Sequence, residues 1–568
     1  MKFLIKFLPF LVIVILSYWA IRPFFVPGFF PMHDDTQVAR VFEMNKSLGD
    51  GLFPVRFVAD LGYNFGYPLF NFYAPLAYYV GGLAAFFTDA LTATKIMMVL
   101  GVMLAGVFMY LFAKEFWGRG GGLIATLLYL YAPYHALDMY VRGDVAEFWA
   151  YAFIPLLFYG LWKAYKERTW TFVILGSLGY AGIILSHNLT GMMVTPFALV
   201  FGFFLYLAAR SEKKLYKPYY PLLILLIGIL LSAFYWLPVF GEMKYTNVLS
   251  QVGGGADYKD HFVCPIQLWD SPWGFGGSTP TCVDGLSFKI GKAHIVLFFV
   301  SLISVFFLRK NPSASSGQVK FWFAAVSVIS LLVAVFLTLA QSRFIWDSLD
   351  QMAFLQYPWR FLIVVSFFIS FLGGSIIFLG RRFISSKLLL AGFVGFVSAV
   401  IIYVNHDAFF TQTVVDKTAS DYTNDYTLRW TTSIISDEYM PKNFIKPRIP
   451  QEVPEQRIQP TEDVEILSLS QKTQEIKAQV KAKVKTDMLI KQAYFPGWHV
   501  FIDGVQKDFG YFNRGLVVAL PAGEHTLDIR FSQTTIEKIG DTLSLTGFLV
   551  LLIGIIYRRK RIHEHKKA

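Results

Sequence analysis

Two adjacent carboxylates, Asp34 and Asp35, are the residues whose type and spacing most directly suggest chemistry. They follow His33 directly, shortly after an apolar run near the N-terminus. Such a pair can hold a divalent cation, Mg²⁺ or Mn²⁺, beside a phosphate, or one carboxylate can act as general base for a sugar hydroxyl. Alternatively, one of them caps a helix expected through Phe42 to Leu48. The two roles are compatible, so Asp34 and Asp35 are our candidate catalytic and metal-binding residues.

Other polar residues stand at the ends of later apolar runs. Arg142 and Glu147 either pair with each other or Arg142 binds a lipid phosphate. His187 lies in a tight turn, where it is either an interfacial residue or a ligand. Glu242 is either a second carboxylate of the site or a solvated loop residue. Arg360 either contacts a phosphate or extends to lipid headgroups. The predicted substrate-binding residues are His33, Arg142, Glu147, His187, Asn188, Glu242 and Arg360.

Aromatic side chains are dense between residues 63 and 75, in the same predicted loop as the two aspartates. Such rings stack on sugars or line a groove for an isoprenoid chain. They also anchor loops at the membrane interface. The sequence leaves these alternatives open.

The composition requires that lipid solvates much of the chain. Of 568 residues, 55% are hydrophobic and 16% charged, whereas soluble domains carry about 25% charged residues. The net charge of +12 resides in short basic clusters between apolar runs, which is typical of a cytoplasmic membrane face. No basic surface interleaved with aromatic residues accompanies them, which argues against a nucleic-acid partner.

About twelve runs are long enough to span a membrane. They lie at 4–21, 95–113, 121–138, 148–164, 171–187, 189–209, 219–240, 292–308, 319–340, 359–380, 387–405 and 540–557. The first is expected to be a retained anchor, because no small-residue cleavage pattern follows it. The stretch 72–88 is short and contains Pro75, Gly81 and Gly82, so we predict a re-entrant or interfacial segment. Both termini and the basic clusters are then cytoplasmic, and all candidate site residues lie outside.

This topology predicts three parts. Residues 1–405 form a transmembrane domain with outer loops at 22–94 and 241–291, residues 406–539 an extracytoplasmic, mostly β domain, and residues 540–568 a last helix with a basic tail. Strand alternation at 476–484, 488–493, 499–503, 516–520 and 525–531 indicates a small antiparallel β-sandwich. The stretch 411–460 shows no clear periodicity. Cys264 and Cys282 share one outer loop, either as a disulfide or as two thiols.

The order of these pieces resembles the GT-C superfamily of membrane glycosyltransferases. More closely, it resembles the YfhO-like and 6-pyruvoyl-tetrahydropterin synthase related bacterial membrane proteins. The matching motifs lie at His33 to Asp35, 62–68, 72–76, 140–147, 186–188, 236–238, 357–360 and 494–498. The resemblance implies that Asp34 or Asp35 is the catalytic or metal-binding carboxylate and that arginines receive a lipid phosphate.

The function implied by this resemblance is sugar transfer from a polyprenyl-phosphate donor to an envelope glycan, lipid or protein acceptor, at the outer face of the cytoplasmic (inner) membrane. A lipid or polysaccharide transporter or flippase is the alternative from another class, although charges in the later spans stay at their ends. A non-catalytic scaffold that presents the β domain to envelope partners is the third hypothesis.

Overall fold

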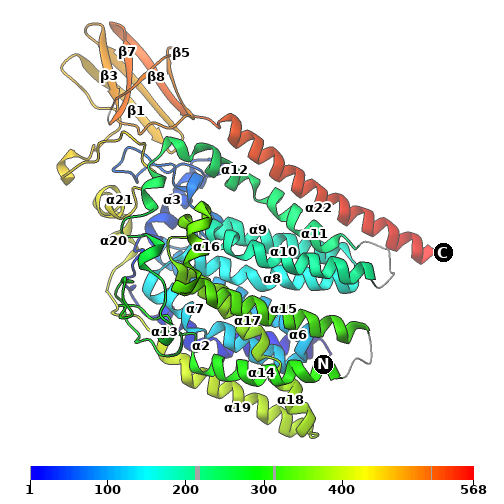
Figure 1. Cartoon of the computed structure of the whole chain (residues 1–568). Coiled ribbons are helices and arrows are strands. Elements are labelled where there is room, and N and C mark those ends of the chain that lie inside the picture. Colours follow the sequence, from blue (N-terminus) through cyan, green and yellow to red (C-terminus); the bar gives the residue numbers. More distant parts are fainter. Residues whose placement is uncertain (1, 212–217, 311–314, 513, 568) are drawn as a thin grey trace.

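Figure 1 shows the chain as a bundle of helices with β-strands at one end. The computed structural model describes residues 2–211, 218–310, 315–512 and 514–567. The labels of both chain termini lie at the end of the bundle away from the strands, and the last helix, α22, runs along one side between the two ends. We name the end that carries the strands the β-end.

Helices account for most of the chain, since an apolar segment in lipid must satisfy its backbone hydrogen bonds internally. The first half contains α1 (Lys2–Leu16), α2 (Tyr18–Ile21), α3 (Gln37–Gly49), α4 (Leu69–Phe72), α5 (Leu76–Ala84), α6 (Ala90–Leu130), α7 (Pro133–Leu137), α8 (Val145–Glu167), α9 (Trp170–Ser186), α10 (Asn188–Ser211), α11 (Tyr220–Leu231) and α12 (Ala233–Glu242). The second half contains α13 (Pro265–Trp269), α14 (Lys292–Lys310), α15 (Ser315–Thr338), α16 (Arg343–Ser348), α17 (Leu362–Gly373), α18 (Ile376–Phe383), α19 (Lys387–Asn405), α20 (Ala419–Thr423), α21 (Ser433–Ile435) and α22 (Thr535–Lys567).

Among the described residues, seven helices are long and apolar enough to cross a membrane, or nine if each of two bent pairs is one span. The predicted count of about twelve is therefore not confirmed, although every predicted run is helical. Three differences account for the gap. Two runs form the shorter apolar helices Trp170–Ser186 and Lys292–Leu308, and the runs at 95–113 and 121–138 both belong to α6.

The 41-residue helix α6 folds back on itself at Gly118, whose φ of 73° and ψ of −177° are not helical. A methyl group on Gly106 would lie 3.1 Å from Leu130, and one on Gly122 would lie 3.0 Å from the Cβ of Lys114. Residues on the two arms therefore meet in antiparallel order. Glycine suits this turn because other residues rarely adopt a positive φ.

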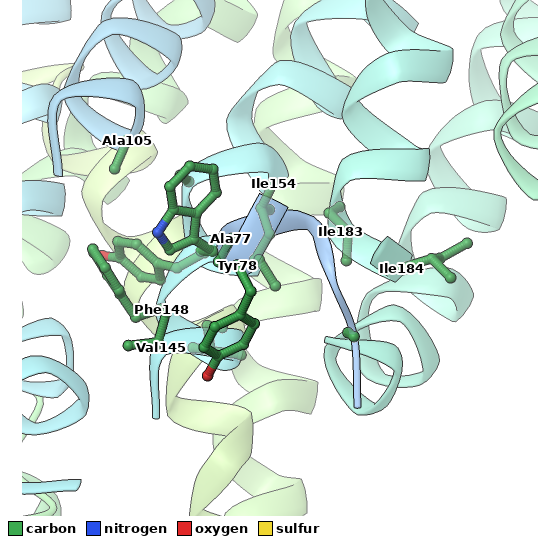
Figure 2. Close-up of a cluster of buried hydrophobic side chains, with 14 of the residues drawn as sticks. Ala77, Tyr78, Ala105, Val145, Phe148, Ile154, Ile183 and Ile184 are labelled. Carbon is green, nitrogen blue, oxygen red and sulfur yellow. The ribbon is translucent and has the colours of Figure 1, made fainter. Parts of the chain in front are cut away.

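The segment 72–88 begins at the last residue of α4 and otherwise contains the nine-residue helix α5. At about 1.5 Å per residue, such a helix is too short for a hydrocarbon core about 30 Å thick. Figure 2 shows Ala77 and Tyr78 of α5 among Val145, Phe148 and Ile154 of α8 and two isoleucines of α9. One face of the helix is thus buried against its neighbours, while Leu83 is 54% exposed. The re-entrant or interfacial character of the segment stays a prediction.

The C-terminal region has two antiparallel sheets, ordered β1-β2-β8-β4-β5 and β3-β7-β6. The strands are β1 (Val464–Lys472), β2 (Glu475–Ala482), β3 (Thr486–Ile490), β4 (Trp498–Ile502), β5 (Val505–Lys507), β6 (Gly510–Phe512), β7 (Gly515–Leu520) and β8 (Gly523–Phe531). The five predicted strands are confirmed, while β1 and the two three-residue strands were not predicted. Buried and exposed residues alternate along β2, as a half-buried sheet requires. A sandwich arrangement of the sheets stays a prediction.

The stretch 411–460, which lacks periodicity, lies over the loop that follows α3. The Tyr63 hydroxyl donates to Asp437 at 2.9 Å, and the Asn64 amide donates to the carbonyl of Pro454 at 2.7 Å. The backbone N–H of Tyr439 donates to the Tyr67 hydroxyl at 3.2 Å. Contacts far apart in sequence, rather than local periodicity, therefore hold this stretch in place.

A buried charged cluster joins α3 to the residues before the strands. Glu43 is fully buried, and its Oε2 accepts the backbone N–H of Ala59 at 3.1 Å. Arg457 donates to the carbonyl of Ala59 at 2.6 Å and to Gln492 at 2.9 Å. Burial, followed by the negative charge of Asp60, raises the pKa of Glu43 to about 8.

We expect a Glu43→Gln variant to be more stable than the wild type at pH 8 to 9, with the difference shrinking toward pH 5. The folded state keeps a proton on Glu43 that the unfolded state releases near pH 4.5, so the wild-type free energy of unfolding falls as pH rises toward 8. Glutamine imitates the protonated acid. Thermal unfolding of both proteins across this pH range tests the prediction, and parallel curves would contradict it.

Candidate functional site

A cavity of about 1260 Å³ lies at the β-end of the bundle. Its walls come from the residues before and within α3, from the start of α8, and from the junction of α9 and α10. The segment 248–278, the turn before α17 and residues 435–439 complete the lining. Charged residues therefore gather here from parts of the chain more than 400 residues apart.

Asp34 is positioned by its backbone. The N–H of His33 donates to the carbonyl of Val141 at 3.0 Å, and the N–H of Asp34 donates to that of Arg142 at 2.9 Å. The side-chain amide of Gln37 donates to the carbonyl of Gly143 at 2.7 Å and so links the same turn to the start of α8. The carboxylate of Asp34 lines the cavity and forms no hydrogen bond with another described residue. The predicted capping role is not seen, because Thr36 is the N-cap of α3 and no side chain caps it.

Arg142 is the centre of a buried ion cluster. It donates to Asp144 at 2.7 Å, to Glu147 at 2.8 Å, and to Asp138 at a very short separation. Its guanidinium also lies 4.7 Å from the ring centre of Trp359. Arg142 thus pairs with three carboxylates. Of its two predicted roles, these contacts support a structural clamp that pairs with Glu147 rather than a ligand of the lipid phosphate.

Arg360, in the turn before α17, reaches the same carboxylates. Its Nε lies 3.3 Å from Glu147 and its Nη2 lies 3.8 Å from Asp144. Its Nη1 donates to the carbonyl of Leu355 at 2.9 Å and to Gln356 at 3.0 Å. Arg360 is 7% exposed and lines the cavity, so it presents a desolvated positive charge to any ligand there.

His187 completes this part of the site at the junction of α9 and α10. Its Nδ1 lies 2.8 Å from the hydroxyl of Thr190. Asp144, Glu147 and His187 each offer an atom within 4.8 Å of the others, close enough to hold a metal ion. However, the two carboxylates already pair with Arg142 and Arg360. A cation and the two arginines would compete for the same oxygen atoms, so these residues fit a metal poorly.

Burial and charge shift the acids of the cavity in opposite directions. Burial and the negative charge of Asp144 raise the pKa of Asp34, against the opposing charges of Arg40, Arg142 and Arg360. Burial would also raise the pKa of Asp144, but Arg142 and its cationic neighbours hold it below the ordinary value. Asp34 is therefore the better proton acceptor of the two, and Asp144 is the permanent negative charge.

Four further charged residues line the cavity although they were not among the predicted site residues: Arg40, Asp144, Asp437 and Glu438. Arg40 follows Asp34 by six positions on α3, and Glu438 belongs to the stretch without periodicity. Arg40 had a signal, since its position at the start of a helix after the aspartates places it near them. Glu438 had none, because only tertiary contacts bring residues 435–439 to the cavity.

The predicted site residues divide into two groups. His33, Asp34, Arg142, His187, Asn188 and Arg360 line the cavity, and Glu147 lies directly behind Arg142. Asp35 does not line the cavity. The charged neighbour that affects the pKa of Asp35 is Lys417. Glu242 lies elsewhere as well, where it accepts from Asn71 at 2.8 Å and from Thr534 at the start of α22. The structure thus separates the adjacent aspartates and removes Glu242 from the cavity.

One wall of the cavity is apolar. It is formed by the ends of α9 and α10 together with α11 and α12, and comprises Ile184, Leu189, Met192, Pro196, Ile229, Trp236, Val239, Phe240 and Met243. Phe240 is 65% exposed, so the cavity reaches the protein surface beside it. On α10, Val200 and Phe203 are also more than half exposed. The apolar wall is therefore continuous with a helix surface suited to lipid.

The opposite end of the bundle is basic. Lys163 and Lys166 of α8 lie 3.5 and 3.0 Å from the carboxylate of Glu115 beside the turn of α6, and Lys320 of α15 donates to the Glu115 carbonyl at 2.7 Å. The predicted basic positions within 212–217 lie outside the described residues. Lys163, Lys166 and Lys320, which belong to the predicted cytoplasmic clusters, thus lie together at one end of the bundle, and the cavity lies at the other.

Residues 70–252 match the model of a family described as "6-pyruvoyl-tetrahydropterin synthase related domain; membrane protein". The expected resemblance to that family is confirmed over this range. A curated relative, an uncharacterized protein of Lactococcus lactis subsp. cremoris (strain MG1363), is 25% identical over 249 residues. The match spans 41% of this chain and 40% of the relative.

Three solved structures of membrane glycosyltransferases are similar in part. The Archaeoglobus fulgidus oligosaccharyltransferase tethered to an acceptor peptide is 14% identical with a TM-score of 0.45, over 81% of this chain and 62% of that one. Its complex with Zn and sulfate is 14% identical with a TM-score of 0.39, over 79% and 59%. ArnT from Cupriavidus metallidurans bound to undecaprenyl phosphate is 11% identical with a TM-score of 0.31, over 67% and 78%. These scores are too low to support a functional argument.

Proposed function

We propose that this protein is a membrane glycosyltransferase that transfers a sugar from a polyprenyl-phosphate donor to an envelope acceptor at the outer face of the cytoplasmic membrane. One observation carries the proposal: a single cavity combines an apolar wall that reaches the protein surface with a buried cluster of arginines and carboxylates. An amphiphile with a charged head and a long apolar tail fits such a cavity.

The polar wall supplies the groups that sugar transfer needs. Asp34 accepts the proton of the acceptor hydroxyl, whose oxygen attacks the anomeric carbon of the donor sugar. The bond between that carbon and the phosphate oxygen breaks, and its electron pair stays on the departing polyprenyl phosphate. Arg360 stabilises this negative charge, because a desolvated guanidinium binds phosphate strongly. Direct displacement of this kind inverts the anomeric centre.

Arg142, Asp144 and Glu147 position these groups. Asp144 and Glu147 pair with Arg360 and so link it to the start of α8. Asp144 also caps α8, because its carboxylate accepts the backbone N–H of Glu147 at 3.0 Å. Because Arg360 can carry the leaving charge, the proposed reaction does not depend on a metal ion at Asp144, Glu147 and His187.

Transport of a lipid is the rival function, and the end of the bundle opposite the cavity disfavours it. There, Lys163 and Lys166 pair with Glu115, and Lys320 joins them. A transporter exposes its site to both faces in turn, which would require these contacts to open. The cavity and its polar groups lie at one end of the bundle only. This arrangement is better suited to chemistry at one membrane face.

We expect Arg360→Gln to weaken binding of polyprenyl phosphate by about tenfold or more, the loss of one charge-assisted contact. The binding constant is measured with purified protein in lipid nanodiscs. Arg343→Gln is the matched control, since Arg343 is 55% exposed and pairs only with the exposed Asp347 among the described residues. Equal binding by wild type and Arg360→Gln, or failure of the wild type to bind polyprenyl phosphate, would contradict the proposal.

A further inference from the structure

The corner of the cavity where α3 meets residues 435–439 holds a second set of polar groups. Arg40 is only 4% exposed, and its Nη2 donates to the hydroxyl of Ser436 at 3.1 Å. The same hydroxyl donates to Glu438 at 3.3 Å. The Nε and Nη1 atoms of Arg40 find no hydrogen-bond partner among the described residues. Buried guanidinium donors are rarely left unpaired, so a ligand is the natural partner for this side chain.

Aromatic residues line the cavity in the same corner. The guanidinium of Arg40 lies 4.0 Å from the ring centre of Tyr73. Phe72 stacks on Tyr439 with ring centres 5.4 Å apart, and all three aromatic residues line the cavity. The apolar wall of α9 to α12 does not include this corner. The cavity therefore has an apolar part and a polar, aromatic part.

Resting on the proposed function, we propose that Arg40, Glu438, Tyr73 and Tyr439 form the subsite that binds the pyranose ring of the donor, and that this subsite selects a neutral sugar. The hydroxyls of a pyranose both donate and accept, so neighbouring hydroxyls can satisfy a carboxylate and a guanidinium together. The carbon face of the ring packs on tyrosine rings.

The charges at this corner explain the selection. Arg40 lies near two carboxylates, Glu438 and Asp34, so its positive charge is already balanced. A sugar that carries its own carboxylate, such as a uronic acid, would add a third negative charge to a desolvated corner. A neutral hexose or N-acetylhexosamine brings hydrogen-bonding groups without that repulsion.

The test compares three ligands on the same protein in nanodiscs: undecaprenyl phosphate, undecaprenyl phosphates carrying neutral hexoses or N-acetylhexosamines, and one carrying a uronic acid. We expect at least one neutral sugar to tighten wild-type binding about tenfold over the bare lipid phosphate, and the uronic acid not to do so. In Glu438→Gln this gain should fall below about threefold, while binding of the bare lipid phosphate stays within about twofold.

Each outcome is decisive. Retained binding of bare undecaprenyl phosphate shows that Glu438→Gln is folded, and Asp425→Asn, which removes an exposed carboxylate of the same region, is the matched control. An unchanged gain in Glu438→Gln, no gain from any neutral sugar, or a larger gain from the uronic acid overturns the subsite. Failure of the wild type to bind the bare lipid phosphate instead overturns the proposed function.

Discussion

Sugar transfer by an Asp34→Asn variant is expected to fall by about 10²-fold to 10⁴-fold, the usual contribution of a general base. Asparagine keeps the size of the side chain but cannot accept the proton of the acceptor hydroxyl. The backbone contacts of residue 34 with Arg142 do not involve the side chain, so the fold should remain intact. The measurement is release of polyprenyl phosphate from a labelled donor in proteoliposomes.

The adjacent residue provides the matched control. Asp35 does not line the cavity, and Asp35→Asn should retain transfer within about threefold of the wild type, as expected for a side chain outside the reaction. Equal losses in both variants would mean that the pair acts together, as a metal-binding pair would, and would contradict our separation of the two. Unchanged transfer by folded Asp34→Asn would remove Asp34 from the mechanism.

The pH profile gives a second test of Asp34. A general base works in its ionised form, and burial together with Asp144 raises the pKa of Asp34 above its ordinary 3.8. Transfer should therefore decline on the acidic side at a pH above that value. Replacing Asp144 by asparagine removes a neighbouring negative charge and should shift this decline to lower pH, measured as kcat/KM against pH.

The sequence predicted those parts of the fold that depend on local pattern. Apolar length located the long helices, and alternation located five of the eight strands but not the nine-residue β1, because each pattern reflects which face of an element meets lipid or core. Pro75 and two glycines disfavoured a full crossing by the stretch 72–88, in which α5 has only nine residues. Strands β5 and β6 have only three residues each, too few for alternation to be recognised.

Apart from His33 and Asp34, the predicted site residues were chosen because they stand near the end of an apolar run. His187 and Arg360 have that position, and the structure brings both to the cavity. Glu242 has it too but pairs with Asn71 and α22 instead, because a position at a helix end does not define which neighbour it faces. Glu438 required the tertiary contacts of residues 411–460, for which the sequence offers no periodic signal.

An Arg142→Gln variant is expected to lose about 3–5 kcal/mol of stability, the usual effect of removing one partner from a buried ion cluster. Asp144 and Glu147 would remain buried with Arg360 as their only described guanidinium partner, at 3.8 and 3.3 Å. The measurement is thermal unfolding in detergent, with the exposed Arg343→Gln as control. Lysine at position 142 should restore only part of the loss, because one ammonium cannot reproduce the fork of contacts.

The same variant separates the two roles considered for Arg142. If Arg142 is a clamp, the loss of stability in Arg142→Gln should be largest near neutral pH and smaller near pH 5. Carboxylates freed from Arg142 take up protons more readily, and a neutral acid needs no charged partner. As a phosphate ligand, Arg142→Gln would instead leave stability nearly unchanged and weaken binding of polyprenyl phosphate. Three carboxylates on one guanidinium favour the first outcome, which assigns phosphate binding to Arg360 and leaves Arg142 to hold the site together.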